Sequence, residues 1–133
     1  MKSDDQLIEE LKRATEGLLF MSEADYPFEI VRLEGTVELS QQYLRELGGA
    51  KADAPVQSKT VDEFFRAAVS EPEWKKGEEL AVARRYQSLL RLLKENLTEL
   101  SVYRIGQIKM HVFILGRSGE GNWIGVRTRI VET

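Results

Sequence analysis

Residues 107–131 read QIKMHVFILGRSGEGNWIGVRTRIV, and this stretch decides the fold. Residues 107–115 and 122–131 each alternate between two kinds of side chain, as successive positions of a β-strand do. The positions that share one face are Ile108, Met110, Val112 and Ile114 in the first strand, and Ile124, Val126, Thr128 and Ile130 in the second. The glycine-containing loop between them, residues 117–121, is typical of a β-hairpin. The pattern predicts an antiparallel sheet with one buried face and one wetter face.

Helical patterns precede this hairpin. Ser3 and Gln6 form a capping box that opens a helix, and Gly17 ends it. A second helix is expected over residues 39–47. Thr60 and Glu63 cap a third in the same way. The longest helix is expected over residues 78–97, with an apolar stripe formed by Leu80, Val82, Tyr86, Leu89, Leu90, Leu93 and Leu97. These helices must cover the sheet, so we predict the α+β class, built as a layered sandwich.

The remaining segments are shorter. Residues 18–21 are fully apolar and are expected to form a buried connection, and residues 22–27 to form a loop. Strands are expected over residues 28–33, 56–59 and 102–105. We found no internal repeat, and the length of 133 residues fits one domain over residues 1–133.

Composition excludes several classes of protein. The chain has no cysteine, which excludes disulfides and thiolate metal sites. It has no apolar run long enough to cross a membrane and no apolar core of a secretory signal, so we expect a soluble cytoplasmic protein. The net charge is −3, but residues 1–34 carry −5 and residues 80–133 carry +5. Either these charges form an acidic face that steers a basic partner, or the segments intermix and their fields cancel.

No residue pattern typical of an enzyme is present. His111 is the only histidine and lies in the middle of a predicted strand, where a structural or solvent-facing role is more common than proton transfer. Ser118 lacks the strand–turn–helix context of a hydrolase nucleophile. We therefore predict a protein with no catalytic residue, no cofactor and no metal site of its own.

Exposed acids near apolar residues are the remaining candidates. Glu23 and Asp25 lie in the predicted loop after residues 18–21, and Thr133 contributes the terminal carboxylate beside Glu132. Terminal charges are in most proteins only solvated.

Trp74 follows Glu73 in a polar loop, and this tryptophan has two interpretations. Composition favours a ring folded back on the core beside Phe64 or Phe65, since large rings are mostly buried. The alternative is an exposed interface anchor, because tryptophan is enriched among binding hot spots.

A collinear set of short motifs spans nearly the whole chain. The motifs are residues 17–23 (GLLFMSE), 26–29 (YPFE), 53–55 (DAP), 64–65 (FF), Trp74, residues 102–104 (VYR) with Gly106, and residues 131–133 (VET). In order and spacing this set resembles the nuclease A inhibitor family. The resemblance implies a three-layer α/β/α sandwich around a mainly antiparallel sheet. It also implies a partner, a sugar-nonspecific DNA/RNA endonuclease that uses magnesium and a histidine base in a basic cleft.

The resemblance also implies which residues bind the partner. The functional acid of the Met-Ser-Glu segment falls on Glu23, and the acid before the tryptophan falls on Glu73. The tryptophan falls on Trp74. The terminal threonine, whose end reaches the nuclease metal site, falls on Thr133. Glu73 departs from the shorter aspartate expected there, which lengthens its reach by one methylene.

Two functions therefore remain open. The first is a nuclease inhibitor that plugs the active site with carboxylates, as a monomer that forms a one-to-one complex without contacting nucleic acid or membranes. The second is an intracellular protein-interaction module on the same fold whose partner is not a nuclease.

Overall fold

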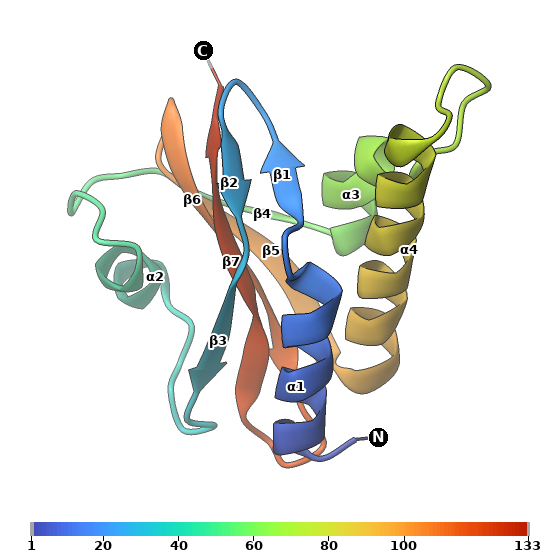
Figure 1. The fold of residues 1–133 in the computed structure, drawn as a ribbon. Helices are drawn as coiled ribbons and strands as arrows, with labels where there is room; N and C mark the ends of the chain where they lie inside the picture. Colours follow the sequence, from blue (N-terminus) through green and yellow to red (C-terminus); the bar gives the residue numbers. More distant parts are fainter. Residues whose placement is uncertain (1, 133) are drawn as a thin grey trace.

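A computed structural model of the chain describes residues 2–132, within which four helices and seven strands form (Figure 1). The helices are α1 (Asp4–Thr15), α2 (Gln41–Leu47), α3 (Val61–Val69) and α4 (Glu78–Asn96). The strands are β1 (Leu19–Met21), β2 (Asp25–Pro27), β3 (Glu29–Leu33), β4 (Val56–Lys59), β5 (Thr98–Ile105), β6 (Lys109–Arg117) and β7 (Trp123–Val131). The predicted α+β class is confirmed.

Five strands form one antiparallel sheet in the order β3-β7-β6-β5-β4, and β1 pairs with β2 in a separate hairpin. The predicted hairpin lies at the centre of the sheet, where β6 and β7 pair from Lys109↔Val131 to Arg117↔Trp123. Helices α1, α3 and α4 cover one face of the sheet, and α2 lies against the other (Figure 1). The molecule therefore has a helical layer, a sheet and a second, thinner helical layer.

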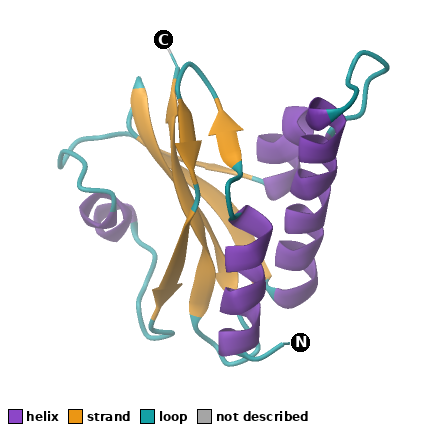
Figure 2. Cartoon of the chain, viewed as in Figure 1, coloured by secondary structure: helices purple, strands orange, loops and turns teal. Residues whose placement is uncertain are grey.

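Both faces of the sheet are buried at its centre. On one face Val112 packs in a cluster with Leu7 of α1 and Leu89 of α4. On the other face Phe113 packs in a second cluster with Leu44 of α2. Figure 2 shows that long loops lead into and out of α2. The prediction of one wetter face was wrong at the centre, where a short helix and its flanking segments cover the second row of apolar side chains. It was right for Arg129 on the same face, which is exposed.

The helix starts agree with the sequence. Ser3 and Gln6 form the predicted capping box, and the Thr60 hydroxyl accepts from the backbone N–H of Glu63. In α4 one position of the predicted stripe was wrong, since Val82 is 38% exposed whereas Ala83 is buried. Ala83 lies three residues before the buried Tyr86, at the spacing that a 3.6-residue period favours.

Three predictions about where strands lie were wrong. Residues 18–21 and 22–27 are not a buried connection and a loop, because β1 and β2 pair within them and Met21 is 75% exposed. Strand β5 begins at Thr98, four residues earlier than expected. Ile108 lies outside β6 and is 55% exposed, so it does not belong to the buried face.

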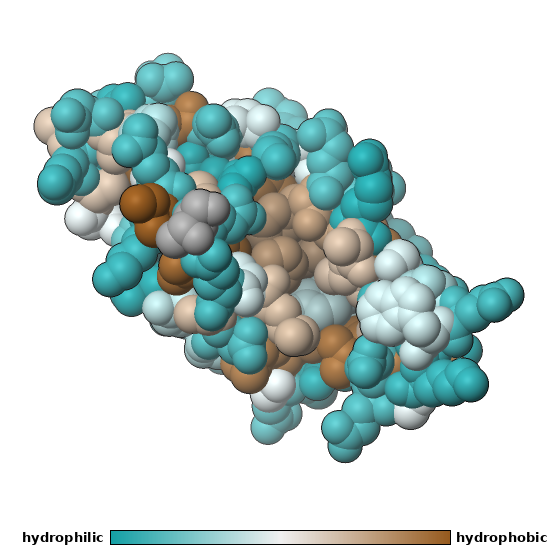
Figure 3. All heavy atoms as spheres, turned by 90° about the horizontal axis from the view of Figure 1, so that it is seen from above, coloured by the Kyte–Doolittle hydropathy of each residue, from teal (hydrophilic) through white to brown (hydrophobic). Residues whose placement is uncertain are grey.

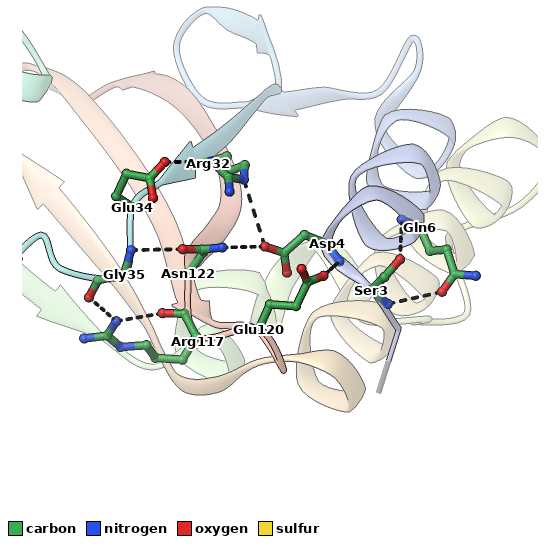
Figure 4. A network of polar contacts seen from close by, with 10 residues as sticks. Ser3, Asp4, Gln6, Arg32, Glu34, Gly35, Arg117, Glu120 and Asn122 are labelled. Atoms are coloured by element: carbon green, nitrogen blue, oxygen red, sulfur yellow. Dashed lines mark hydrogen bonds and ion pairs between the residues drawn. The ribbon is translucent and has the colours of Figure 1, made fainter.

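A polar network ties the start of α1 to the sheet (Figure 4). The Asn122 amide donates to the Asp4 carboxylate over 2.8 Å and accepts from the backbone N–H of Gly35 over 3.0 Å. Arg117 donates to the Gly35 carbonyl oxygen over 2.6 Å, and the Glu120 carboxylate accepts from the backbone N–H of Asp4. The network therefore joins α1, the β6–β7 turn and the segment after β3 at the N-terminal end of the molecule.

Candidate protein-binding surface

Three segments lie at the end of the molecule opposite this network, which we call the hairpin end. They are the β1–β2 turn (residues 22–24), Glu132 after β7, and, set apart from these two, the α3–α4 loop (residues 70–77), all toward the top of Figure 1. The candidate residues Glu23, Glu73 and Trp74 belong to these segments. Thr133 lies outside the described residues.

The β1–β2 turn is fastened to the end of β7. The Ser22 hydroxyl accepts from the backbone N–H of Val131 over 3.0 Å and donates to the Ala24 carbonyl oxygen over 2.8 Å. The backbone N–H of Glu23 donates to the Val131 carbonyl oxygen over 3.1 Å. Two segments more than 100 positions apart are thereby joined, and the exposed Glu23 is held beside the last residues of the chain.

The end of β7 is itself held on its other side. The backbone N–H of Glu132 donates to the Ile108 carbonyl oxygen over 2.9 Å. The Glu132 carboxylate pairs with Arg104 over 2.8 Å, where the arginine side chain is 11% exposed. Glu132 is the last described residue. Its backbone N–H and its carboxylate are both bound within the protein, and these two contacts fix its position.

An aromatic cluster seats the hairpin on the helices. The Phe20 ring stacks on the Phe64 ring with centroids 4.6 Å apart and planes 12° apart. The Tyr86 hydroxyl of α4 donates to the Leu19 carbonyl oxygen. Burial raises the pKa of Tyr86, with Arg85 opposing this effect, so the hydroxyl remains a donor at neutral pH. A hairpin with strands of three residues is too short to be stable alone, and this packing supplies its support.

Trp74 projects from the α3–α4 loop. Its side chain is 69% exposed, and the Lys75 ammonium lies 5.7 Å from the ring centroid. The interpretation that this ring folds back beside Phe64 or Phe65 was wrong, because Phe20 and Tyr86 surround those rings instead.

The loop that carries Trp74 is braced against α3 and α4. The Lys75 ammonium donates to the carbonyl oxygens of Ala67 and Ser70, and the Gln87 amide donates to the Glu71 carboxylate. Glu73 is exposed, and within residues 2–132 no hydrogen bond or ion pair engages its carboxylate. The loop therefore presents an acid and a large ring from an ordered backbone.

Exposed apolar side chains gather at this end. Among the described residues, the large apolar side chains that are exposed are Leu19, Met21, Trp74, Val82 and Ile108. All belong to the hairpin, the α3–α4 loop, the start of α4 or the β5–β6 turn. Figure 3 looks down on the hairpin end and shows a hollowed, hydrophobic centre between hydrophilic margins. An apolar area rimmed by polar residues is typical of a protein-binding surface.

Two other kinds of feature are absent from residues 2–132. Within residues 2–132, no group of three or more histidine, aspartate or glutamate side chains is placed to hold a metal ion. In the same part of the chain, no helix has the length and apolarity needed to cross a bilayer.

A family model described as nuclease A inhibitor-like protein matches residues 5–133. The chain belongs to the nuclease A inhibitor-like family. A search among curated proteins found no match. The match spans nearly the whole chain, which agrees with the collinear motifs found in the sequence.

In this family member the structure brings Glu23, Glu73 and Trp74 to one end, but sequence reasoning missed their supports. It placed Glu23 on a loop and did not foresee that Ser22 and Val131 join the turn to β7. It also missed Leu19 and Met21 as surface residues. Leu19 and Met21 are two positions apart, with the less exposed Phe20 between them. That alternation was the signal that indicated a strand with one exposed face.

Proposed function

We propose that this protein inhibits a sugar-nonspecific, magnesium-dependent DNA/RNA endonuclease by inserting carboxylates of the hairpin end into the active site. The observation that carries the proposal is the junction between the β1–β2 turn and β7, which fixes Glu23 beside the last residues of the chain. Membership of the nuclease A inhibitor-like family supports the class of partner. The complex has one copy of each protein, and the free inhibitor is a monomer of one domain over residues 1–133.

Carboxylates suit a nuclease active site because that site is built to receive phosphates. It presents cationic side chains and a hard metal ion to oxygen ligands. Glu23 occupies the position of a phosphate and accepts charge-assisted hydrogen bonds, which are shorter and stronger than neutral ones. The backbone of Glu23 is already hydrogen-bonded to Val131. Binding therefore avoids the cost of ordering the turn, which is about 1–2 kcal/mol per residue.

Thr133 supplies the second carboxylate in this proposal. It follows a strand whose end is fastened on both sides, through the bonds of Val131 to the hairpin turn and of Glu132 to the Ile108 carbonyl oxygen. A single terminal residue that follows such a fixed strand end loses little conformational freedom on binding. The terminal carboxylate reaches the partner's magnesium site, and no metal binds to the inhibitor itself.

Trp74 and the apolar surface exclude water around these acids. A large ring that is 69% exposed loses much of its hydration when a partner covers it, and such rings dominate binding energies. Glu73 precedes it on the same braced loop and adds a contact to the basic rim of the cleft. Acidic residues at this end also steer the encounter, so the association rate falls as salt increases.

The test is a plasmid-cleavage titration with magnesium and purified sugar-nonspecific nucleases of the histidine–metal class. Glu23→Gln and Trp74→Ala should each weaken inhibition by about 30-fold or more, as hot-spot losses of about 2 kcal/mol require. The matched controls are Glu95→Gln and Arg91→Ala, both at exposed positions in the second half of α4 and outside the hairpin end. Control variants that lose as much inhibition, or an intact protein that inhibits no enzyme of the panel, would support the interaction module with another partner.

A further inference from the structure

A cavity of about 450 Å³ lies on the α2 side of the sheet, away from the aromatic cluster. Its walls are the segment after α2, residues 49–55, and the β5–β6 turn, residues 105–109. Gly49, Ala50 and Gly106 contribute no side chain beyond Cβ, which leaves room inside. Ligand sites in proteins have volumes of roughly 300–1,000 Å³, so a small molecule fits this space.

Two cationic side chains line the cavity. They are Lys51 and Lys109, which lie in its wall with His111, and Asp53 is the one acid among its lining residues. Within residues 2–132 no ion pair engages either lysine. In a chain with a net charge of −3, this is a local concentration of unneutralised positive charge.

The adjoining strand adds to this charge. Arg129 lies directly across from His111 on β7, and Arg127 lies two residues away on the same face. Arg127 stacks on the Phe113 ring with its guanidinium carbon 4.9 Å from the centroid, and in the described part of the chain neither arginine forms an ion pair. The sheet face beside the cavity is therefore also cationic.

The pKa of His111 is sensitive to these positive charges. Burial lowers the pKa of His111, and Arg129 and Arg127 lower it further. Its Nδ1 atom is buried, and no partner for it is found within residues 2–132. The groups around the ring are Ile105 from β5, Gly48 at the end of α2, the two arginines of β7, and the cavity's Lys51, Lys109 and Asp53.

We propose that this cavity binds a small phosphate-bearing anion, with Lys51 and Lys109 as its charge-neutralising contacts and His111 at its wall. A diphosphate group carries several negative charges and accepts charge-assisted hydrogen bonds from both lysines at once. A bound anion also favours the protonated form of His111, which burial and the arginines of β7 disfavour. Neither Glu23 nor Trp74 lines the cavity, so the proposal does not depend on the nuclease.

The single histidine makes the test direct. We would follow the ring resonances of His111 by NMR while adding inorganic pyrophosphate, and in a second arm adenosine diphosphate. A saturable shift and a rise of about 1 in the pKa of His111 are expected, because an opposite charge within hydrogen-bonding range favours the protonated ring. Tighter binding of the nucleotide would identify a nucleoside diphosphate as the ligand, and equal binding would identify the phosphate group alone.

The double variant Lys51→Gln/Lys109→Gln should bind pyrophosphate at least about tenfold more weakly. The matched control, Lys12→Gln/Lys76→Gln, changes the net charge equally at exposed positions outside the cavity and should bind as the intact protein does. Each single cavity variant serves if the double variant fails to fold. No saturable response of His111 at millimolar pyrophosphate would overturn the proposal, as would equal weakening in the control.

Discussion

Ser22→Ala tests whether the turn presents Glu23 as a rigid acid. The hydroxyl of Ser22 makes two hydrogen bonds, one from Val131 and one to Ala24, and the alanine removes both. Each such bond contributes about 0.5–1.5 kcal/mol, so the turn loses about 1–3 kcal/mol of preference for its native conformation. Global stability should fall by less than about 1 kcal/mol, because a short surface hairpin opens locally without unfolding the core.

Binding has to restore the lost order of the turn. The apparent affinity for the nuclease should therefore fall by about 5- to 150-fold, the factor that corresponds to about 1–3 kcal/mol. The assay is the inhibition constant from cleavage titrations, with the free energy of unfolding from urea denaturation alongside. Ser88→Ala, at an exposed serine of α4, is the matched control and should change neither quantity.

A double-mutant cycle with Glu23→Gln separates positioning from other effects. If Ser22 acts through Glu23, the double variant should inhibit about as well as Glu23→Gln alone, since no carboxylate remains to be positioned. Fully additive losses of binding free energy would refute the reasoning, because Ser22 would then contribute independently of Glu23. An unchanged inhibition constant in Ser22→Ala would refute it as well.

The remaining predictions concern stability. Phe65→Ala should lower the free energy of unfolding in urea by about 3–5 kcal/mol, because it empties a fully buried ring position; a loss below 1 kcal/mol would contradict the described core. Asn122→Ala should cost about 1–3 kcal/mol by leaving Asp4 and Gly35 without their shared partner, yet leave nuclease inhibition unchanged; reduced inhibition at native stability would be inconsistent with its distance from the hairpin end. Stability should fall as pH drops below about 6.5, because the unfolded chain takes up a proton at His111 before the native protein does. His111→Gln should flatten that fall in urea titrations between pH 7.5 and pH 5, and identical pH profiles would argue against it.

Local signals predicted the helices and the central strands. Ser3 with Gln6 is a contact between near neighbours, and the alternation of residues 122–131 is visible within a single strand. It was harder to predict which residues at the start of α4 face the core. Val82 and Ala83 are both apolar, and only the packing against the neighbouring layer decides which of them is buried. The burial of the second face of the sheet also depends on where α2 packs, and no local sequence pattern predicts that position.

The candidate surface depends on contacts that are distant in sequence. An apolar run such as residues 18–21 is compatible with a buried connection or with a strand, and the contact of Phe20 with Phe64 decides between them. Trp74 is exposed because Lys75 and Gln87 brace its loop, which composition does not reveal. The sequence itself singled out Glu23, Glu73, Trp74 and Thr133 as candidates, and the resemblance to the nuclease A inhibitor family implied what each of them does. Their roles in binding remain predictions.

The most direct test of the active-site plug is the mode of inhibition. Steady-state cleavage of a short fluorescent DNA duplex would be measured at several substrate concentrations, with the intact chain and with a chain that lacks Thr133. The proposal predicts that the intact chain raises the apparent KM and leaves kcat unchanged, and that removing Thr133 weakens this effect. A fall in kcat at constant KM, equal for both chains, would place the inhibitor outside the active site and contradict the account.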